Sequence, residues 1–282
     1  MATPKSKRSA LLKGQIAEGQ KELLKITAEA RKAIELKILK AAERGDFVRA
    51  ASVRDGLYNG IADEYVKLNR GVNDWTKKRS KTVAKSWHTL AIDDLPKAAA
   101  GVTFGQFSEK YLTDIIGKVN PATASKKVAI NARMGGMLAE DVAAIRAAVT
   151  DTLRQGALTG MTNPQLSAEM IKKVKGIKPM TQFIDKAGRK WTSDSYFGML
   201  NRTLHATVAR ETYADTALEA GFDLMFIEGG PSAGPPDDPC NRWYGKVISM
   251  TGKTKGYPTY SDSLSDGMWH PNCAHSMSVY TP

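Results

Sequence analysis

Apolar and small residues recur at alternating spacings of three and four along the first third of the chain. A first run consists of Leu12, Ile16, Gly19, Leu23, Ile26, Ala30 and Ala33. A second run consists of Phe47, Ala51, Arg54, Tyr58, Ile61, Tyr65, Leu68, Val72 and Trp75. This spacing is typical of one face of a helix. Because Gly45 and Asp46 between the runs suit a C-cap and an N-cap, the pattern predicts two long amphipathic helices in an antiparallel hairpin.

Proline and glycine mark shorter elements in the middle of the chain. Asn120-Pro121 is expected to start a short helix, since proline is favoured in the first helical turn. The spacing over 137–155 predicts a second helix that ends at Gly156. Asn163-Pro164 opens a third that stops at Gly176. The middle of the chain is therefore predicted to consist of compact helices.

The last hundred residues change from a helical to a strand-like pattern. Residues 178–191 predict a small hairpin around a glycine, and residues 195–220 a long helix that follows a Ser-Asp cap. Beyond Gly221, strand-like runs occur at 224–227, 246–250 and 276–280. Glycine, proline and aspartate are concentrated between the first two of these runs, which predicts loops there.

These elements indicate an α+β protein that is mostly helical, with a long N-terminal helical hairpin and a small C-terminal β-rich unit. The pattern changes after Pro96 and again after Gly221. We therefore expect a basic amphipathic hairpin over 1–95, a compact helical region over 96–220, and a β-rich unit that carries a Cys/His cluster over 221–282.

Positive charge is concentrated at the N-terminal end. Residues 1–90 contain 20 Lys and Arg against 10 Asp and Glu, whereas residues 91–282 contain 21 against 19. Such a field attracts polyanions and weakens with salt, which favours nucleic acid as a partner. A lysine-rich coiled coil that docks on another protein is the alternative. No secretion signal and no run of membrane-spanning length is found, so no membrane partner is expected.

A cluster of cations beside Trp75 is the candidate DNA-contacting segment. It consists of Lys77, Lys78, Arg79, Lys81 and Lys85. Cations next to an aromatic ring suit phosphate contact together with base or sugar packing, without sequence-specific readout. A solvated helix face has the same composition, and that alternative stays open.

The C-terminal region contains residues that bind soft metals. His270, Cys273 and His275 lie within six residues, and Cys240 lies thirty residues upstream. Together they form a candidate Cys2His2 site for structural zinc. Packing and hydrogen bonding without a metal is an alternative, and so is a Cys240–Cys273 disulfide, which requires oxidising conditions. With two cysteines in the whole chain, a reducing compartment fits best.

A metal-dependent nuclease is the alternative function, because His270, His275 and Asn272 lie close in sequence to one another and Asp237-Asp238 supplies carboxylates. The two aspartates lie between prolines, in an extended segment where adjacent side chains point apart. Sequence motifs for phosphate-binding loops, serine hydrolases and zinc proteases are absent. No catalytic residue is therefore assigned, and a non-enzymatic role is expected.

Three C-terminal motifs resemble those of the phage Mu F-type head morphogenesis or minor capsid proteins. A long helix contains Arg210-Glu211-Thr212 and runs on to an alanine and Gly221-Phe222-Asp223. A loop with aspartates and Cys240 precedes Trp243-Tyr244-Gly245-Lys246-Val247. The third motif is His270-Pro271-Asn272-Cys273-Ala274-His275, in which Ala274 stands where the family usually has arginine. The resemblance covers residues 137–282.

This resemblance implies a minor head protein of a tailed phage or prophage. Such a protein associates with the portal protein and other head proteins, and contacts DNA without sequence preference during assembly, packaging or DNA exit. It is found in the prohead and virion, and in the host cytoplasm during assembly. The N-terminal hairpin lies outside the resemblance.

Overall fold

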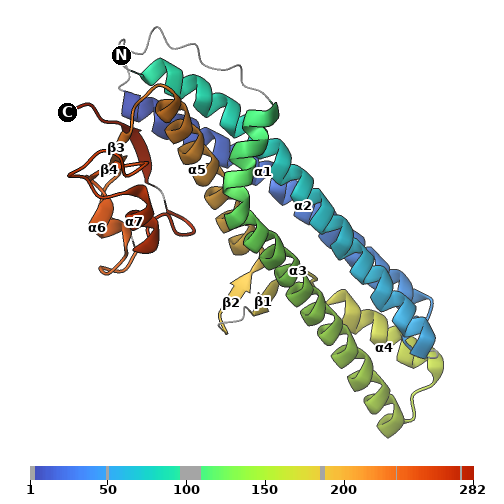
Figure 1. Ribbon diagram of the computed structural model, residues 1–282. Helices are drawn as coiled ribbons and strands as arrows, with labels where there is room; N and C mark the ends of the chain where they lie inside the picture. The colour runs from blue at the N-terminus through green and yellow to red at the C-terminus, as the bar shows by residue number, and fades with distance from the viewer. Residues whose placement is uncertain (1–3, 49–50, 96–108, 185–187, 233, 274) are drawn as a thin grey trace. The chain divides into compact units, whose positions relative to one another are not determined.

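The structure, a computed structural model, describes residues 4–48, 51–95, 109–184, 188–232, 234–273 and 275–282. Helices predominate in these residues, and the strands form two small antiparallel sheets (Figure 1). The α+β prediction is thus confirmed. None of the helices in the described ranges combines the length and the apolar character that a membrane crossing requires. Residues 96–101, where a boundary was predicted, lie outside the described residues.

The chain divides into two compact units, neither of which is one continuous stretch. Unit 1 contains residues 1–20, 76–124 and 198–282, and unit 2 contains residues 21–75 and 125–197. The predicted segments 1–95 and 96–220 each contribute to both units, whereas 221–282 belongs wholly to unit 1.

In unit 1, parts of three helices pack side by side. The helices are α1 (Pro4–Glu43), α2 (Ala51–Asp94) and α5 (Ser193–Glu219). The Trp87 indole donates to Gln15 Oε1 (3.0 Å), and Arg8 pairs with Asp94, so α1 and α2 run antiparallel here. The Asn201 amide donates to the Ile16 carbonyl (2.8 Å), which fixes α5 against α1. The antiparallel arrangement predicted for the two N-terminal helices is thus present in the parts of α1 and α2 that belong to unit 1.

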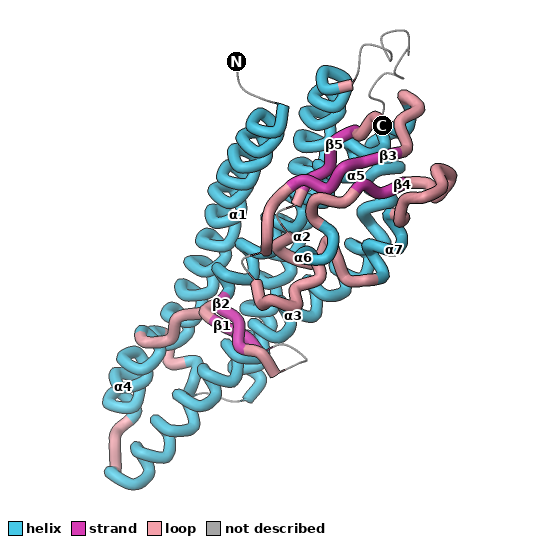
Figure 2. Tube along the Cα trace, turned by 90° about the vertical axis from the view of Figure 1, so that its left-hand side faces the viewer, coloured by secondary structure: helices cyan, strands magenta, loops and turns pink. Residues whose placement is uncertain are grey.

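Unit 1 also contains a three-stranded antiparallel sheet with the order β4-β3-β5 (Figure 2). The strands are β3 (Leu224–Glu228), β4 (Val247–Ser249) and β5 (Ser276–Val279), as predicted within two residues. Two short helices, α6 (Cys240–Trp243) and α7 (Tyr260–Ser265), were not predicted. Their four and six residues are too few to show a helical period, although the Thr259–Asp262 capping box is present at the start of α7.

In unit 2, the residues that α1 buries are partly different from those predicted. Most of the second run is confirmed, since Ile61, Tyr65, Leu68, Val72 and Trp75 are buried, whereas Arg54 and Tyr58 are partly exposed. On α1 the buried positions include Leu23, Thr27, Ile34 and Ile38, whereas Ile26, Ala30 and Ala33 are partly exposed. The prediction followed apolar residues only, and it missed Thr27, whose hydroxyl is satisfied by the Leu24 carbonyl.

A single helix, α3 (Glu109–Thr159), replaces the two predicted short helices. The predicted start at Asn120-Pro121 and the predicted end at Gly156 both lie inside it, so these two predictions are wrong. Gly156 has a packing role instead, because a Cβ there would lie 2.2 Å from Leu166 Cδ2 of α4. The glycine thus permits close packing of α3 on α4.

The remaining elements of unit 2 agree with the predictions. Helix α4 (Asn163–Lys175) begins with a capping box of Thr162 and Gln165. Strands β1 (Gln182–Ile184) and β2 (Lys190–Thr192) form the predicted hairpin. Its tip, 185–187, lies outside the described residues. Asp141 of α3 is 6% exposed and accepts hydrogen bonds from the Tyr65 hydroxyl (2.6 Å) and the Met180 amide (3.1 Å).

Candidate metal centre

The four predicted metal ligands come from separate segments of unit 1 that meet beside the three-stranded sheet. Cys240 is the first residue of α6. His270 and Cys273 lie in the loop that follows α7, and His275 directly precedes β5. The loop is turned by left-handed backbone at Trp269 (φ 66°) and Asn272 (φ 70°), and the Cys273 amide donates to the His270 carbonyl (3.0 Å).

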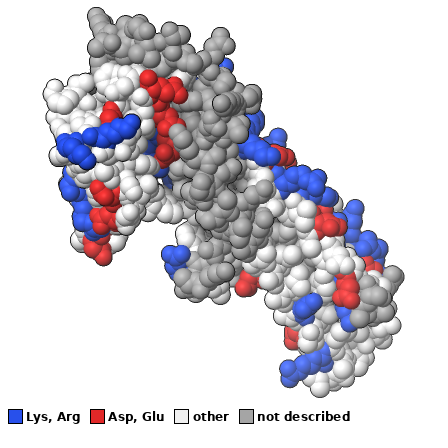
Figure 3. Space-filling model, in the orientation of Figure 1, with Lys and Arg blue, Asp and Glu red and all other residues white. Residues whose placement is uncertain are grey.

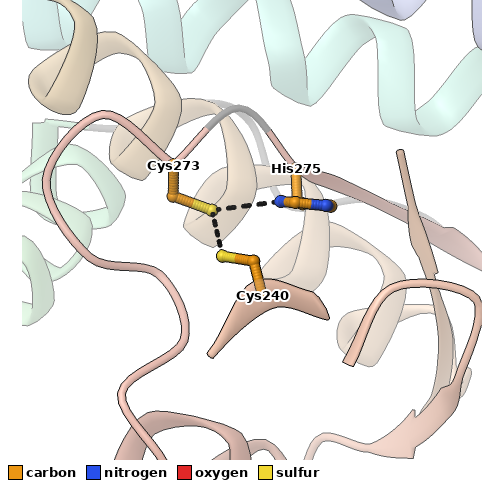
Figure 4. A group of neighbouring side chains, drawn as sticks. All are labelled: Cys240, Cys273 and His275. Carbon is orange, nitrogen blue, oxygen red and sulfur yellow. Dashed lines mark hydrogen bonds between the residues drawn. The ribbon is translucent and has the colours of Figure 1, made fainter. Parts of the chain in front are cut away.

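Three of the four donor atoms are clustered. The sulfur atoms of Cys240 and Cys273 are 3.5 Å apart, and Cys273 Sγ is 3.5 Å from His275 Nδ1. In Figure 4 the three side chains point toward one another, with the Cys273 sulfur between the other two. All three residues are buried, and neither cysteine forms a disulfide. The cluster therefore offers two sulfur ligands and one nitrogen ligand within 4.8 Å of one another.

His270 belongs to a second group, which shares Cys240 with the first. His270 Nε2 is 3.2 Å from Cys240 Sγ and 3.3 Å from Asp238 Oδ1. The His270 side chain is 32% exposed, whereas that of Asp238 is 8% exposed. His270 is thus the ligand candidate with the most room to move.

Both histidine rings are oriented by main-chain carbonyls. His275 Nε2 is 2.9 Å from the Gly230 carbonyl, and His270 Nδ1 is 2.8 Å from the Pro271 carbonyl. A carbonyl only accepts, so in these hydrogen bonds Nε2 of His275 and Nδ1 of His270 carry the proton. In the neutral ring the other nitrogen then has a lone pair, which faces sulfur in both cases.

The two thiols are in different electrostatic environments. Burial, together with the nearby Cys273, raises the pKa of Cys240 to about 12. Burial also opposes ionisation of Cys273, but hydrogen bonds from the His275 side chain and backbone outweigh it and lower the pKa of Cys273. The same hydrogen bond with Cys273 raises the pKa of His275. Cys273 is therefore the more acidic of the two thiols.

Several supporting residues were not predicted. Gly229 has φ 142°, and a Cβ there would lie 2.4 Å from His275 Cδ2, so only glycine leaves space for the ring. The Tyr244 ring stacks with the His275 ring, with ring centroids 6.3 Å apart. The Gly229-Gly230 pair directly after a strand was the available signal, because glycine there often marks a close approach.

Asp238 positions Cys240. Its Oδ1 accepts the Cys240 amide (2.8 Å), and its Oδ2 accepts the Ser232 hydroxyl (2.8 Å). Burial opposes ionisation of this carboxyl, but the hydrogen bonds from Ser232 and Cys240 lower its pKa to about 2. Asp237 is exposed, in contrast to the buried Asp238. The two aspartates thus face different environments, and the carboxylate pair that a nuclease site requires is not formed by them.

The loop that carries His270 and Cys273 is also fastened to α5. The Arg210 guanidinium lies over the Trp269 ring, 4.4 Å from its centroid, and Arg210 is 6% exposed. Glu211 accepts a hydrogen bond from the Tyr260 hydroxyl of α7. Arg202 Nε donates to Asn272 Oδ1 (2.9 Å). The helix motif of the sequence resemblance thus packs directly on the residue that precedes His270.

The predicted DNA-contacting residues all lie on the unit 1 part of α2. Lys77, Lys78, Lys81 and Lys85 are exposed. Arg79 is 3% exposed, and its guanidinium donates to Glu18 Oε2 (3.0 Å) and to the Gln15 carbonyl (3.1 Å). This burial argues against the predicted phosphate contact for Arg79. The spacing carried a signal for this, because Arg79 is two residues from Lys77 and from Lys81 and therefore on the opposite side of the helix.

Comparison with known proteins identifies a family. The sequence model of phage minor capsid protein 2 matches residues 141–282, which is half of the chain. Searches of curated proteins and of solved structures gave no match. The matched half includes α4, α5, both sheets and the whole Cys/His cluster. The chain belongs to the phage minor capsid protein 2 family.

Proposed function

We propose that this protein is a minor head protein of a tailed phage or prophage, of the Mu F-type, which associates with the portal and binds DNA without sequence preference. The family match carries the proposal, since it assigns the C-terminal half to phage minor capsid proteins. The prohead and virion are the expected locations, and other head proteins are the expected partners.

A row of lysines on α2 supports the DNA contact. Lys77, Lys81 and Lys85 recur every four residues and are exposed, so they lie along one side of the helix. At a rise of 1.5 Å per residue, the row spans about 12 Å, a length over which duplex DNA presents several phosphates. Lys78 lies beside this row. Figure 3 shows one face of the molecule, on which Lys and Arg alternate with Asp and Glu. Contact with phosphate is therefore assigned to the row and not to the whole surface.

Quantitative mass spectrometry of purified proheads and mature particles tests the head assignment. The number of copies of this chain per particle is compared with the number of copies of the portal protein. A second sample of the same particles is treated with a chemical crosslinker to identify the proteins that contact this chain. We expect a small, fixed number of copies per particle and crosslinks to the portal protein. Absence from both kinds of particle contradicts the head role, whereas crosslinks confined to other head proteins contradict the portal contact alone.

A further inference from the structure

We propose that Cys240, His270, Cys273 and His275 bind one zinc ion in a closed, structural Cys2His2 centre. The inference does not rest on the proposed role in the phage head. Thiolate sulfur and imidazole nitrogen are the ligands that zinc prefers in structural sites.

The spacing of the first three donors already fits a tetrahedral zinc site. With Zn–S bonds of about 2.3 Å and Zn–N bonds of about 2.0–2.1 Å, two sulfur ligands are about 3.8 Å apart and a sulfur and a nitrogen about 3.6 Å apart. The corresponding distances are 3.5 Å between the sulfur atoms of Cys240 and Cys273, and 3.5 Å from Cys273 Sγ to His275 Nδ1. Small shifts therefore suffice to accommodate the ion.

The outer contacts have the form that metal-binding histidines require. A ligating histidine commonly donates its second ring N–H to a carbonyl or carboxylate, which fixes the tautomer and the ring orientation. The Gly230 carbonyl has this role for His275, and the Pro271 carbonyl has it for His270. In each ring the nitrogen left for the metal is the one that faces sulfur.

His270 is assigned as the fourth ligand in preference to Asp238. Both oxygens of Asp238 already accept hydrogen bonds, from the Cys240 amide and from Ser232. His270 Nε2 is 3.2 Å from Cys240 Sγ and 3.3 Å from Asp238 Oδ1, and its partly exposed ring, unlike the buried Asp238 carboxylate, has room to turn toward Cys273 and His275. Asp238 then acts as a positioning residue that holds the Cys240 end of α6.

Four protein ligands leave no open position for water or substrate, so the centre is structural and not catalytic. Two thiolates balance the charge of the zinc ion, which makes burial of the centre tolerable. The ion joins α6, the loop after α7 and the start of β5, and through the Gly230 carbonyl it also fixes the residues that follow β3. The three-stranded sheet has short strands and buries a small core, so a zinc ion that joins the segments around it stabilises this region.

The test uses the full-length protein produced with ample zinc under reducing conditions, and measures zinc per chain by elemental mass spectrometry. We expect about one zinc per chain in the wild type and in Lys255→Ala, a control that changes an exposed side chain outside the cluster. Cys273→Ser and His275→Ala should lose most of the zinc. A chelator should lower the thermal midpoint of the wild type, and zinc should restore it, which keeps the test valid if a variant fails to fold.

Cobalt(II) exchanged into the wild-type protein provides the second readout. A tetrahedral site with two thiolates gives sulfur-to-cobalt charge-transfer bands and strong d–d bands. The d–d bands should change strongly in His270→Ala, which removes a ligand, and much less in Asp238→Asn, whose amide oxygen can still accept the Cys240 N–H. Absence of both zinc and these bands in the wild type, or a Cys240–Cys273 disulfide in reduced preparations, overturns the proposal. The reverse result for the two variants overturns the assignment of His270.

Discussion

Asp141 of unit 2 shows how one buried carboxyl links three elements. Its oxygens accept hydrogen bonds from Tyr65 of α2 and from the Met180 amide, which lies between α4 and β1. Burial raises the pKa of Asp141 above its ordinary value of 3.8, although these hydrogen bonds act in the opposite direction. The native state therefore holds this proton more tightly than the unfolded chain does.

The raised pKa of Asp141 predicts a pH dependence of stability. Between pH 3.8 and the raised pKa, the native state binds more protons than the unfolded state, so the free energy of unfolding decreases as the pH rises. Asp141→Asn should remove this decrease in the free energy of unfolding, since an amide keeps an acceptor for Tyr65 but has no proton to lose. Urea unfolding at a series of pH values measures the free energy of unfolding. The exposed Asp237→Asn serves as the control, and an unchanged slope in Asp141→Asn contradicts the assignment.

Local chemistry alone located the start of α4 at Asn163-Pro164. It also singled out Cys240, Cys273 and His275, whose side chains lie together, although metal binding there stays a prediction. Prediction from local chemistry failed where a distant partner decides. Arg79 has the composition of a DNA contact, but Glu18 and the Gln15 carbonyl hold it inside unit 1. A sequence without its fold cannot show such partners.

At the scale of elements, strands and amphipathic helices were predicted well because each has its own period. The errors at this scale are the missed short helices α6 and α7 and the predicted helix boundaries at Pro121 and Gly156, which lie inside α3. A proline costs a helix about 3 kcal/mol and a glycine about 1 kcal/mol, which packing over a long helix can outweigh. The close approach of Leu166 explains why glycine is needed at position 156.

Two glycines on α1 provide a test of close helix packing. A Cβ at Gly19 would lie 2.5 Å from Asn201 Oδ1 and 2.5 Å from His205 Cε1 of α5, whereas a Cβ at Gly14 meets nothing within 4 Å. Gly19→Ala should destabilise the protein by about 1–3 kcal/mol through overpacking. Gly14→Ala should stabilise it by up to about 1 kcal/mol, since alanine is the better helix former.

Urea unfolding of both variants distinguishes packing from helix propensity. The two substitutions add the same methyl group to the same helix, so a difference in sign isolates the contact between α1 and α5. Stabilisation by both alanines would show that α5 does not approach Gly19 closely.

At the scale of the whole molecule, the sequence predicted the fold class but not the composition of the compact units. Unit 1 combines residues 1–20 with 76–124 and 198–282. Sequence boundaries follow changes in composition along the chain, whereas these units depend on contacts between distant segments. Arg8, for example, pairs with Glu228 (2.6 Å) and with Asp94.

The uneven charge of the chain predicts a salt-dependent affinity for duplex DNA that resides in α2. Replacing Lys77, Lys81 and Lys85 together by Gln should reduce the slope of log K against log salt by up to about 2.7, at about 0.9 for each lost phosphate contact. Titrations of the full chain with duplexes of unrelated sequence, at several salt concentrations, measure the slope.

Lys172, Lys175 and Lys178 of unit 2 are equally exposed and provide the matched control. Their joint replacement by Gln removes the same charge but should leave most of the slope intact. Equal losses in the two triple variants would assign the affinity to net charge alone. If the wild-type protein does not bind DNA but binds the portal protein at high salt, the N-terminal helices act as a docking surface for another protein.

The pairing of Arg8 with Glu228 has a consequence for how the chain is made. The two residues are 220 positions apart, so at a synthesis rate of about 5–20 residues per second they leave the ribosome roughly 10 to 45 s apart. During that interval the first turns of α1 have emerged without the strand and the helix α5 on which they pack. Contacts between such distant residues form late and slow folding. Unit 1 can therefore be completed only after the C-terminal sheet has been synthesised, so its N-terminal helix turns wait for partners that are made last.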